Sequence, residues 1–140
     1  MSPSRIISAL LLAFMMVYAL GDFPQGKYIG GEVPPKPYLR IEGDFQKSGK
    51  VHLSVACGPQ RANWDAWFDL VNAGVPRMFR LKDYQTDPKY AKYMSFFTQN
   101  CGRGRAYNGD LTVFIVTNAG ISVTVKGTSI TLYESNTLIK

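Results

Sequence analysis

The stretch NWDAWFDLVNAG, residues 63–74, decides the fold class that the sequence predicts. Its large apolar residues follow the i, i+3, i+4, i+7 spacing of one helix face: Trp64, Trp67, Phe68 and Val71. Asn63 is a suitable N-cap, and Gly74 and Pro76 supply a stop. The pattern predicts a short amphipathic helix. Asp65 and Asp69 then lie on its polar side, where solvated charges are commoner than a catalytic carboxylate pair.

A second helix is predicted downstream, ending near Asn100. Asp87 can cap it, and Pro88 takes the first helical position, where its missing N–H costs nothing. The same spacing recurs in an aromatic stripe: Tyr90, Tyr93, Met94 and Phe97. Such a stripe faces the core in most proteins, and the alternative is a stacking platform for bases or sugars.

Alternating patterns elsewhere predict strands. YLRIEGDF (38–45) and VHLSVAC (51–57) form a hairpin, and VPRMFRL (75–81) contains a short strand. Three alternating segments joined by short loops predict a C-terminal three-stranded meander: LTVFIVT, ISVTVK and SITLYE. The predicted fold is a single small α+β domain, in which two short helices cover an antiparallel sheet made of the hairpin and the meander.

The N-terminus has the three parts of a secretory signal peptide over residues 1–21. Arg5 precedes the uncharged run from Ile6 to Leu20, and Ala19 and Gly21 supply small residues at the −3 and −1 positions of a cleavage site. The alternative, a membrane anchor, needs about 20 apolar residues. We therefore expect a secreted protein that is not stably inserted in a membrane after cleavage.

Two further segments follow the predicted signal peptide. Residues 22–37 are rich in proline and glycine, which predicts a flexible extended arm, and a partner-docking tail is the alternative. The single domain then runs over residues 38–140.

The chain contains two cysteines, Cys57 and Cys101. In an oxidising compartment this number predicts one disulfide, and Cys57 falls on the apolar face of its strand. The alternative is a reactive thiol with a partner histidine.

The sequence predicts no catalytic residue, metal site or cofactor. Its one histidine, His52, lies on the polar face of a strand, with Ser54 two residues away. A histidine-based site needs an orienting acid and a nucleophile, and a zinc site needs three or four ligands. An enzyme is therefore not the favoured reading, although a functional His52 stays open.

The excess positive charge is concentrated in residues 77–105. This segment has seven basic and two acidic residues, whereas the rest of the mature chain is balanced. The predicted binding residues are Arg77, Arg80, Lys82, Lys89, Lys92, Arg103, Arg105 and Tyr107. They could attract an acidic protein face, RNA or an anionic glycan, or they could only keep the domain soluble. The last three lie in NCGRGRAYNGD (100–110), which reads as a loop fixed by the disulfide.

This profile resembles the small secreted effector proteins of plant-pathogenic fungi. Some of those families, such as the ToxB-like (MAX) effectors, hold a β-sandwich with one disulfide, which Cys57 and Cys101 would match. The resemblance implies a non-enzymatic, virulence-type protein that acts on a host protein outside the cell or after translocation into a host cell. A secreted ribonuclease-like or polyanion-binding domain is one alternative, and a lectin-like or inhibitor module is another.

Overall fold

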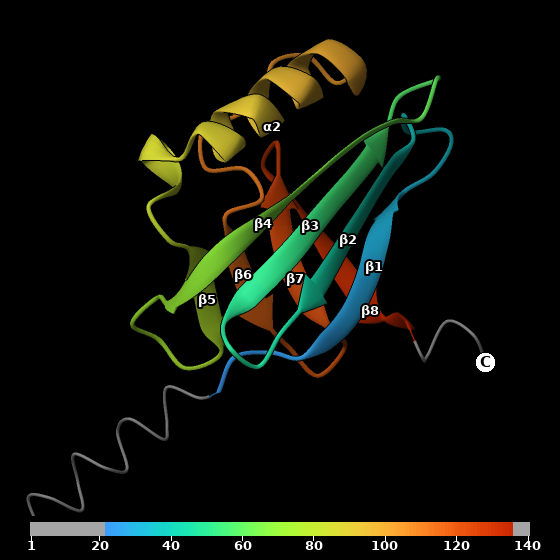
Figure 1. Ribbon diagram of the computed structural model, residues 1–140. Helices are drawn as coiled ribbons and strands as arrows, with labels where there is room; N and C mark the ends of the chain where they lie inside the picture. Colours follow the sequence, from blue (N-terminus) through green and yellow to red (C-terminus); the bar gives the residue numbers. More distant parts are fainter. Residues whose placement is uncertain (1–21, 136–140) are drawn as a thin grey trace, which may run out of the picture.

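Residues 22–135, the part that the computed structural model describes, form one closed antiparallel barrel of eight strands (Figure 1). Each strand pairs with the next along the chain, and β8 pairs with β1 to close the barrel. The predicted signal peptide and the end of the predicted domain, residues 136–140, lie outside the described residues. The predicted α+β fold is wrong, because the described chain consists mostly of strands with one α-helix.

The strands build two opposite walls, which we call the front wall (β1–β4) and the rear wall (β5–β8), as seen in Figure 1. The front wall contains β1 (Gly26–Glu32), β2 (Leu39–Phe45), β3 (Lys50–Cys57) and β4 (Ala62–Asn72). The rear wall contains β5 (Met78–Leu81), β6 (Val113–Val116), β7 (Ile121–Val125) and β8 (Thr128–Glu134). Between β5 and β6 lie the 3-10 turn η1 (Tyr84–Thr86) and the helix α2 (Pro88–Asn100).

Strand β4 occupies the stretch for which the sequence predicted the first helix. Along it Phe68 and Leu70 are buried inside the barrel, while Asp65 and Asp69 point outward. Trp67 and Val71 are apolar residues at outward positions, and they complete the helix-like spacing that made the prediction wrong. The whole first part of β4 pairs with β3, so a neighbouring strand supplies the hydrogen bonds. Aromatic residues fit such a half-buried pleated surface well.

Strand β1 lies within residues 22–37, where the sequence predicted a flexible arm. It pairs with β2 along its length and with β8 at Tyr28 and Ile29. Gly30 is needed for this closure, because a Cβ atom there would lie 2.3 Å from the carbonyl oxygen of Thr131. The glycines that argued against a strand therefore allow two strands to approach closely, which is one of the positional uses of glycine in sheets.

Other predicted elements are confirmed. The hairpin corresponds to β2 and β3, the short middle strand to β5, and the meander to β6, β7 and β8. The second predicted helix corresponds to α2, and the Asp87 side chain accepts a hydrogen bond from the backbone N–H of Lys89 at 2.9 Å.

Side chains from both walls fill the barrel interior. These residues are at most 2% exposed: Phe45, Leu53, Phe79, Phe114, Ile121 and Leu132. The rings of Phe45 and Phe114 meet edge to face across the barrel, 5.5 Å apart. Helix α2 lies across one end of the barrel and buries its aromatic stripe there (Figure 1), with Tyr93 packed against Trp64 of β4. The core-facing reading of the stripe is therefore confirmed, and binding surfaces on this fold have to be sought on its outside.

The predicted disulfide between Cys57 and Cys101 is confirmed. It joins the end of β3 to the residue that follows α2, and both residues are fully buried. The chain passes the helix end closely here, since a Cβ atom on Gly58 would lie 2.0 Å from the carbonyl oxygen of Asn100. Gly58 also has a φ of 78°, a conformation that favours glycine. The bond therefore holds α2 across the end of the barrel.

Candidate functional site

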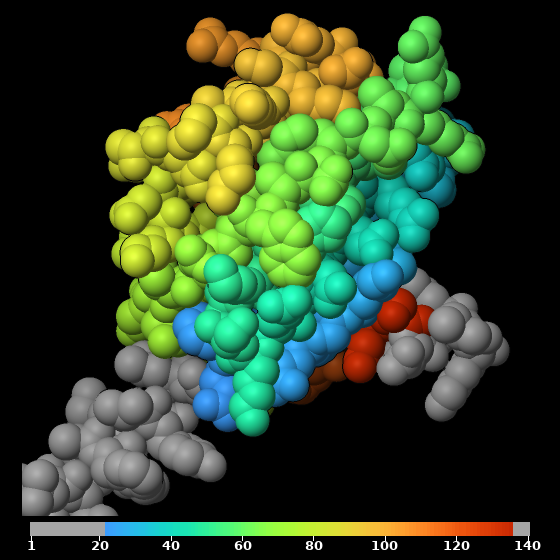
Figure 2. Space-filling view, in the orientation of Figure 1, coloured from blue at the N-terminus to red at the C-terminus, as the bar shows by residue number. Residues whose placement is uncertain are grey.

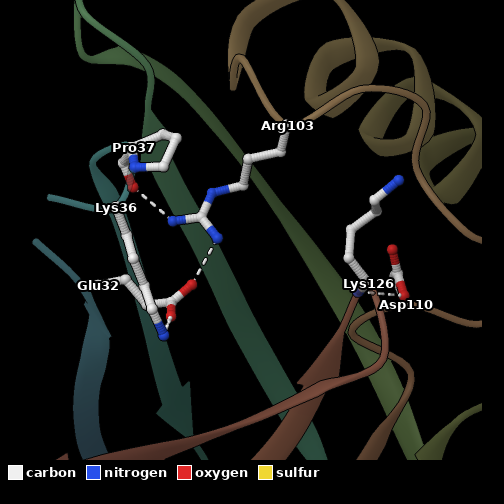
Figure 3. A network of polar contacts seen from close by, with 6 residues as sticks. All are labelled: Glu32, Lys36, Pro37, Arg103, Asp110 and Lys126. Atoms are coloured by element: carbon white, nitrogen blue, oxygen red, sulfur yellow. Dashed lines mark hydrogen bonds and ion pairs between the residues drawn. The ribbon is translucent and has the colours of Figure 1, made fainter.

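Arg103, one of the predicted binding residues, instead makes contacts within the protein. Its guanidinium forms an ion pair with Glu32 at the end of β1 and donates to the backbone oxygen of Pro37 (Figure 3). The Arg103 side chain is only 15% exposed, and that of Glu32 is 10% exposed. A hydrogen bond from Lys36 lowers the pKa of Glu32; burial opposes this shift, and Arg103 adds to it. These contacts fasten the loop after α2 to the front wall.

Asp110 organises the rest of that loop. Its buried carboxylate accepts hydrogen bonds from the backbone N–H groups of Tyr107 and Lys126, both at 2.9 Å. The Tyr90 hydroxyl donates to the backbone oxygen of Asp110 at 2.7 Å, and burial is the main cause that raises the pKa of Tyr90. The Lys126 ammonium lies over the Tyr107 ring, 4.0 Å from its centroid. Tyr107 is exposed, but a cation of the protein itself already covers it.

The remaining basic residues lie on β5, on α2 and in the loops that flank these two elements. Lys82 and Lys89 line a shallow depression of about 330 Å³. Its other lining residues include three carboxylates: Asp69, Asp83 and Asp87. Arg80 extends from β5, Lys92 lines a depression on α2, and Arg105 lines another between α2 and its loop. Arg77 lies in the turn before β5. Acids therefore lie beside Lys82 and Lys89 in the depression that these two cations share.

A different surface combines aromatic and polar groups, and Figure 2 looks onto it. The outward side chains of β2, β3 and β4 form this surface, which we call the Trp67 face: Arg40, Glu42, Asp44, Lys50, His52, Ser54, Asp65, Trp67 and Asp69. Several of its charges pair within the protein, with Lys50 contacting Asp69 at 3.5 Å and Lys27 of β1 contacting Glu42 at 3.2 Å. Trp67 is 45% exposed and is the one large exposed apolar side chain among these residues.

His52 and Asp65 interact with each other on the Trp67 face. Nε2 of His52 lies 2.7 Å from Oδ2 of Asp65, and the imidazole stacks on the Trp67 ring at 4.9 Å with planes 25° apart. The register explains the contact, because His52 and Trp67 are opposite each other on paired strands. The two rings and the carboxylate therefore support one another in a fixed arrangement.

Nucleophilic catalysis by this pair would require a nucleophile bonded to the histidine. Ser54 is opposite Asp65 in the register, and within residues 22–135 no hydrogen bond joins its hydroxyl to His52. The same residues contain no cluster of three metal-ligating side chains. The arrangement presents an exposed indole ring with polar and charged side chains beside it.

Sequence reasoning missed Trp67 as a surface residue because it assigned the indole to a helix face. A usable signal was present: in the alternation of β4, Trp67 stands between Asp65 and Asp69 at polar positions. An aromatic residue in such a row is a candidate surface contact.

Comparison with protein-family models, with curated proteins and with solved structures gave no match. In the described range, none of the helical structure has the length and apolar character required to cross a membrane.

Proposed function

We propose that this protein is a secreted, non-enzymatic binding protein that engages a partner protein through the Trp67 face. The observation that carries the proposal is the exposed Trp67 indole, held against His52 on a sheet wall of a closed barrel. The N-terminal sequence pattern and the disulfide support an extracellular location. The resemblance to secreted fungal effectors makes a host protein the proposed partner.

Trp67 has the properties of an interface anchor. Tryptophan is enriched among the few residues that dominate binding energy, typically at the centre of an interface with polar groups around it. The surrounding ion pairs are exposed and contribute little by themselves, so they act as a polar rim. Because strand pairing and the His52 stack already fix the indole, little conformational freedom is lost on binding.

The basic residues support a secondary role only. Long-range attraction by the cations of residues 77–105 would speed encounter with an acidic partner. A polyanion needs several cations along one track, whereas Lys82 and Lys89 share their depression with three carboxylates. The carboxylates in this depression support the choice of a protein partner in this proposal rather than a polyanion.

The test compares two exposed aromatic positions. Immobilised mature protein is used to capture partners from host extracellular fluid and cell extract, and bound proteins are quantified by mass spectrometry. Trp67→Ala should reduce capture of the specific partner at least about tenfold, the size of effect expected of an anchor residue. A control variant, Arg105→Glu with Tyr107→Ala, should retain capture, because it changes only the loop.

Stability serves as the second control. Trp67 points outward but stacks on His52, so its truncation should lower the free energy of unfolding by no more than about 2 kcal/mol, which leaves the protein folded. Loss of capture in the loop variant with retention in Trp67→Ala would assign binding to the loop and refute the Trp67 face.

A further inference from the structure

One side of strand β4 has no neighbouring strand over most of its length. Strand β3 pairs with residues 62–69, whereas β5 pairs only with Leu70 to Asn72. The last hydrogen bond from the β5 side joins the backbone N–H of Lys82 to the backbone oxygen of Asp69 at 2.8 Å, and the chain then turns into η1. In the part of the chain that the structure describes, no strand pairs with the remainder of this side, residues 62–68, which we call the open edge.

Every second residue of the open edge directs its backbone N–H and C=O groups away from β3. Backbone groups alternate in this way along antiparallel strands. The backbone N–H of Leu70 donates to the oxygen of Gly49 on the β3 side, at 2.7 Å, so the even-numbered residues of β4 face β3. The odd-numbered residues face the open edge: Asn63, Asp65 and Trp67. Within residues 22–135, the hydrogen bonds of the protein leave these backbone groups unused.

Helix α2 lies beside the open edge but packs against the inner side of β4 (Figure 1). The contact is made by the inward side chain of Trp64, whose ring centroid lies 5.1 Å from that of Tyr93. The outward side chains at the open edge stay accessible, with Trp67 45% exposed and the side chain of Asp65 65% exposed. A strand added to β4 therefore meets exposed groups on its outer side and α2 on its inner side.

Helix α2 offers an apolar contact to such a strand. The ammonium of Lys89 lies 5.1 Å from the Phe68 ring centroid, so this side of α2 is next to β4. Helical spacing places Phe96 two turns further along the same side. Phe96 is half-buried and lines a shallow depression of about 410 Å³ on α2. An apolar side chain of the added strand gains from packing there.

Backbone and charge together indicate which occupant fits the open edge. Unpaired N–H and C=O groups at every second residue are complementary to the backbone of another extended chain. The outward row of β4 includes two carboxylates, Asp65 and Asp69, and no cation. They contact His52 and Lys50 of β3, yet each of the two side chains is at least 60% exposed. A second copy of this chain fits poorly, because antiparallel pairing of two open edges sets carboxylates opposite carboxylates.

We propose that an extended basic segment of the partner protein adds to the open edge as a strand antiparallel to β4. The added strand continues the line of β5, which is itself antiparallel to β4. Its outward basic side chains meet Asp65, Asp69 and the Trp67 ring between them, through ion pairing and cation–π contact. Its inward side chains are apolar and pack on Phe96. The inference deepens the proposed function, on which it rests, and it specifies only this segment, so the remainder of the partner can be acidic.

Synthetic peptides test the inference on mature, disulfide-bonded protein. The probe is an acetylated peptide of about eight residues in which valine and lysine alternate, a length that spans the open edge. Two matched versions carry N-methyl groups on every lysine or on every valine. In an antiparallel strand with outward lysines, the lysine N–H groups point at β4 and the valine N–H groups point away. In NMR titrations up to about 1 mM peptide, methylated lysines should weaken binding at least about tenfold and methylated valines should leave it intact.

Amide hydrogen exchange locates the peptide on β4. In the free protein, the backbone N–H groups of Asp65 and Trp67 should exchange fast. Those of Trp64 and Ala66 should exchange slowly, because they face β3. The unmethylated peptide should slow exchange at Asp65 and Trp67 at least about tenfold, since it supplies their missing acceptors.

Two variants at one position separate the backbone from the charge. Asp65→Pro removes an N–H of the open edge and no hydrogen bond to β3, and it should weaken binding of the unmethylated peptide at least about tenfold. The matched control, Asp65→Asn, keeps the N–H and removes only an exposed charge, so it should bind within about threefold of the wild type. Circular dichroism and melting establish that each variant folds, and the methylated peptides test the wild type independently of either variant.

Three results would overturn the inference: an unmethylated peptide that does not bind, two methylated peptides that bind alike, or exchange at Asp65 and Trp67 that the peptide leaves unchanged. Trp67→Ala separates this inference from the proposed function. If partner capture depends on Trp67 but the two methylated peptides bind alike, the proposed function stands and strand addition is refuted. If the peptide adds to the open edge but capture never depends on Trp67, strand addition stands and the indole anchor is refuted.

Discussion

The front and rear walls enclose the same core but are held together differently. The front wall has strands of seven to eleven residues that pair along most of their lengths. In the rear wall, β5 and β6 have four residues each, and their ladders are short. Fewer ladder bonds mean that the rear wall depends more on core packing and on tethers from the α2 loop. Similar barrel strands can therefore have unequal local stability.

The largest expected effect comes from a core residue of the rear wall. Phe114 is fully buried and contacts Phe45 of the front wall, so Phe114→Ala should lower the free energy of unfolding by about 3–5 kcal/mol. Denaturant unfolding measures this loss. In native-state hydrogen exchange, β5 to β7 should lose protection before β2 to β4. Equal loss in both walls would remove the distinction between them.

The disulfide should have the next largest effect. Cys57→Ala with Cys101→Ala removes the bond that closes a loop with a sequence separation of 44 residues. The gain in chain entropy of the unfolded state should lower the free energy of unfolding by up to about 4 kcal/mol. We expect α2 and the rear wall to lose exchange protection first, because the bond anchors the helix end to β3. As a control, thiol titration of the denatured, unreduced wild type should find no free thiol, and two free thiols would contradict the bridge.

The smallest of these effects concerns Glu32, which ties the α2 loop to the front wall. The pKa of Glu32 is lowered in the folded protein. The ion pair therefore stabilises the fold fully at pH values above the usual carboxyl pKa. This stabilisation is lost as the pH falls through the pKa that Glu32 has in the folded protein. Glu32→Gln should cost about 1–3 kcal/mol at neutral pH and flatten the acid side of the stability curve.

Urea unfolding from pH 2.5 to pH 7, on the order of ten values spanning the carboxyl range, measures this curve. Glu42→Gln is the matched control, since its ion pairs are on the exposed Trp67 face and should matter by less than about 1 kcal/mol. An unchanged pH profile in Glu32→Gln would show that the Arg103 tether does not stabilise the fold.

Local patterns predicted the elements whose partners are near in sequence. The Asp87–Pro88 start correctly gave α2, and short turns correctly gave the hairpin and the meander. The prediction for β4 was wrong because Trp67 and Val71 fit helical spacing as well as strand alternation. Only the pairing with β3 decides between a helix and a strand. The prediction for β1 was wrong because the role of Gly30 depends on close contact with β8, a strand about a hundred residues away in the sequence.

The candidate site was predictable only in part. The sequence placed His52 on an outward face of its strand, and this holds in the structure. It could not show that Arg103 turns inward to Glu32, or that Asp65 and Trp67 meet His52. Those contacts depend on strand register and on the path of the α2 loop.

The pairing of β1 with β8 also sets the order of events during synthesis. Strand β1 is synthesised before β8, and the barrel cannot close until β8 is available to pair with it. Such long-range pairing is slow and leaves strand edges open in the meantime. Cys57 and Cys101 precede the three final strands, so their bond can form before closure. In a chain that enters an oxidising compartment, the disulfide would thus form before the barrel closes.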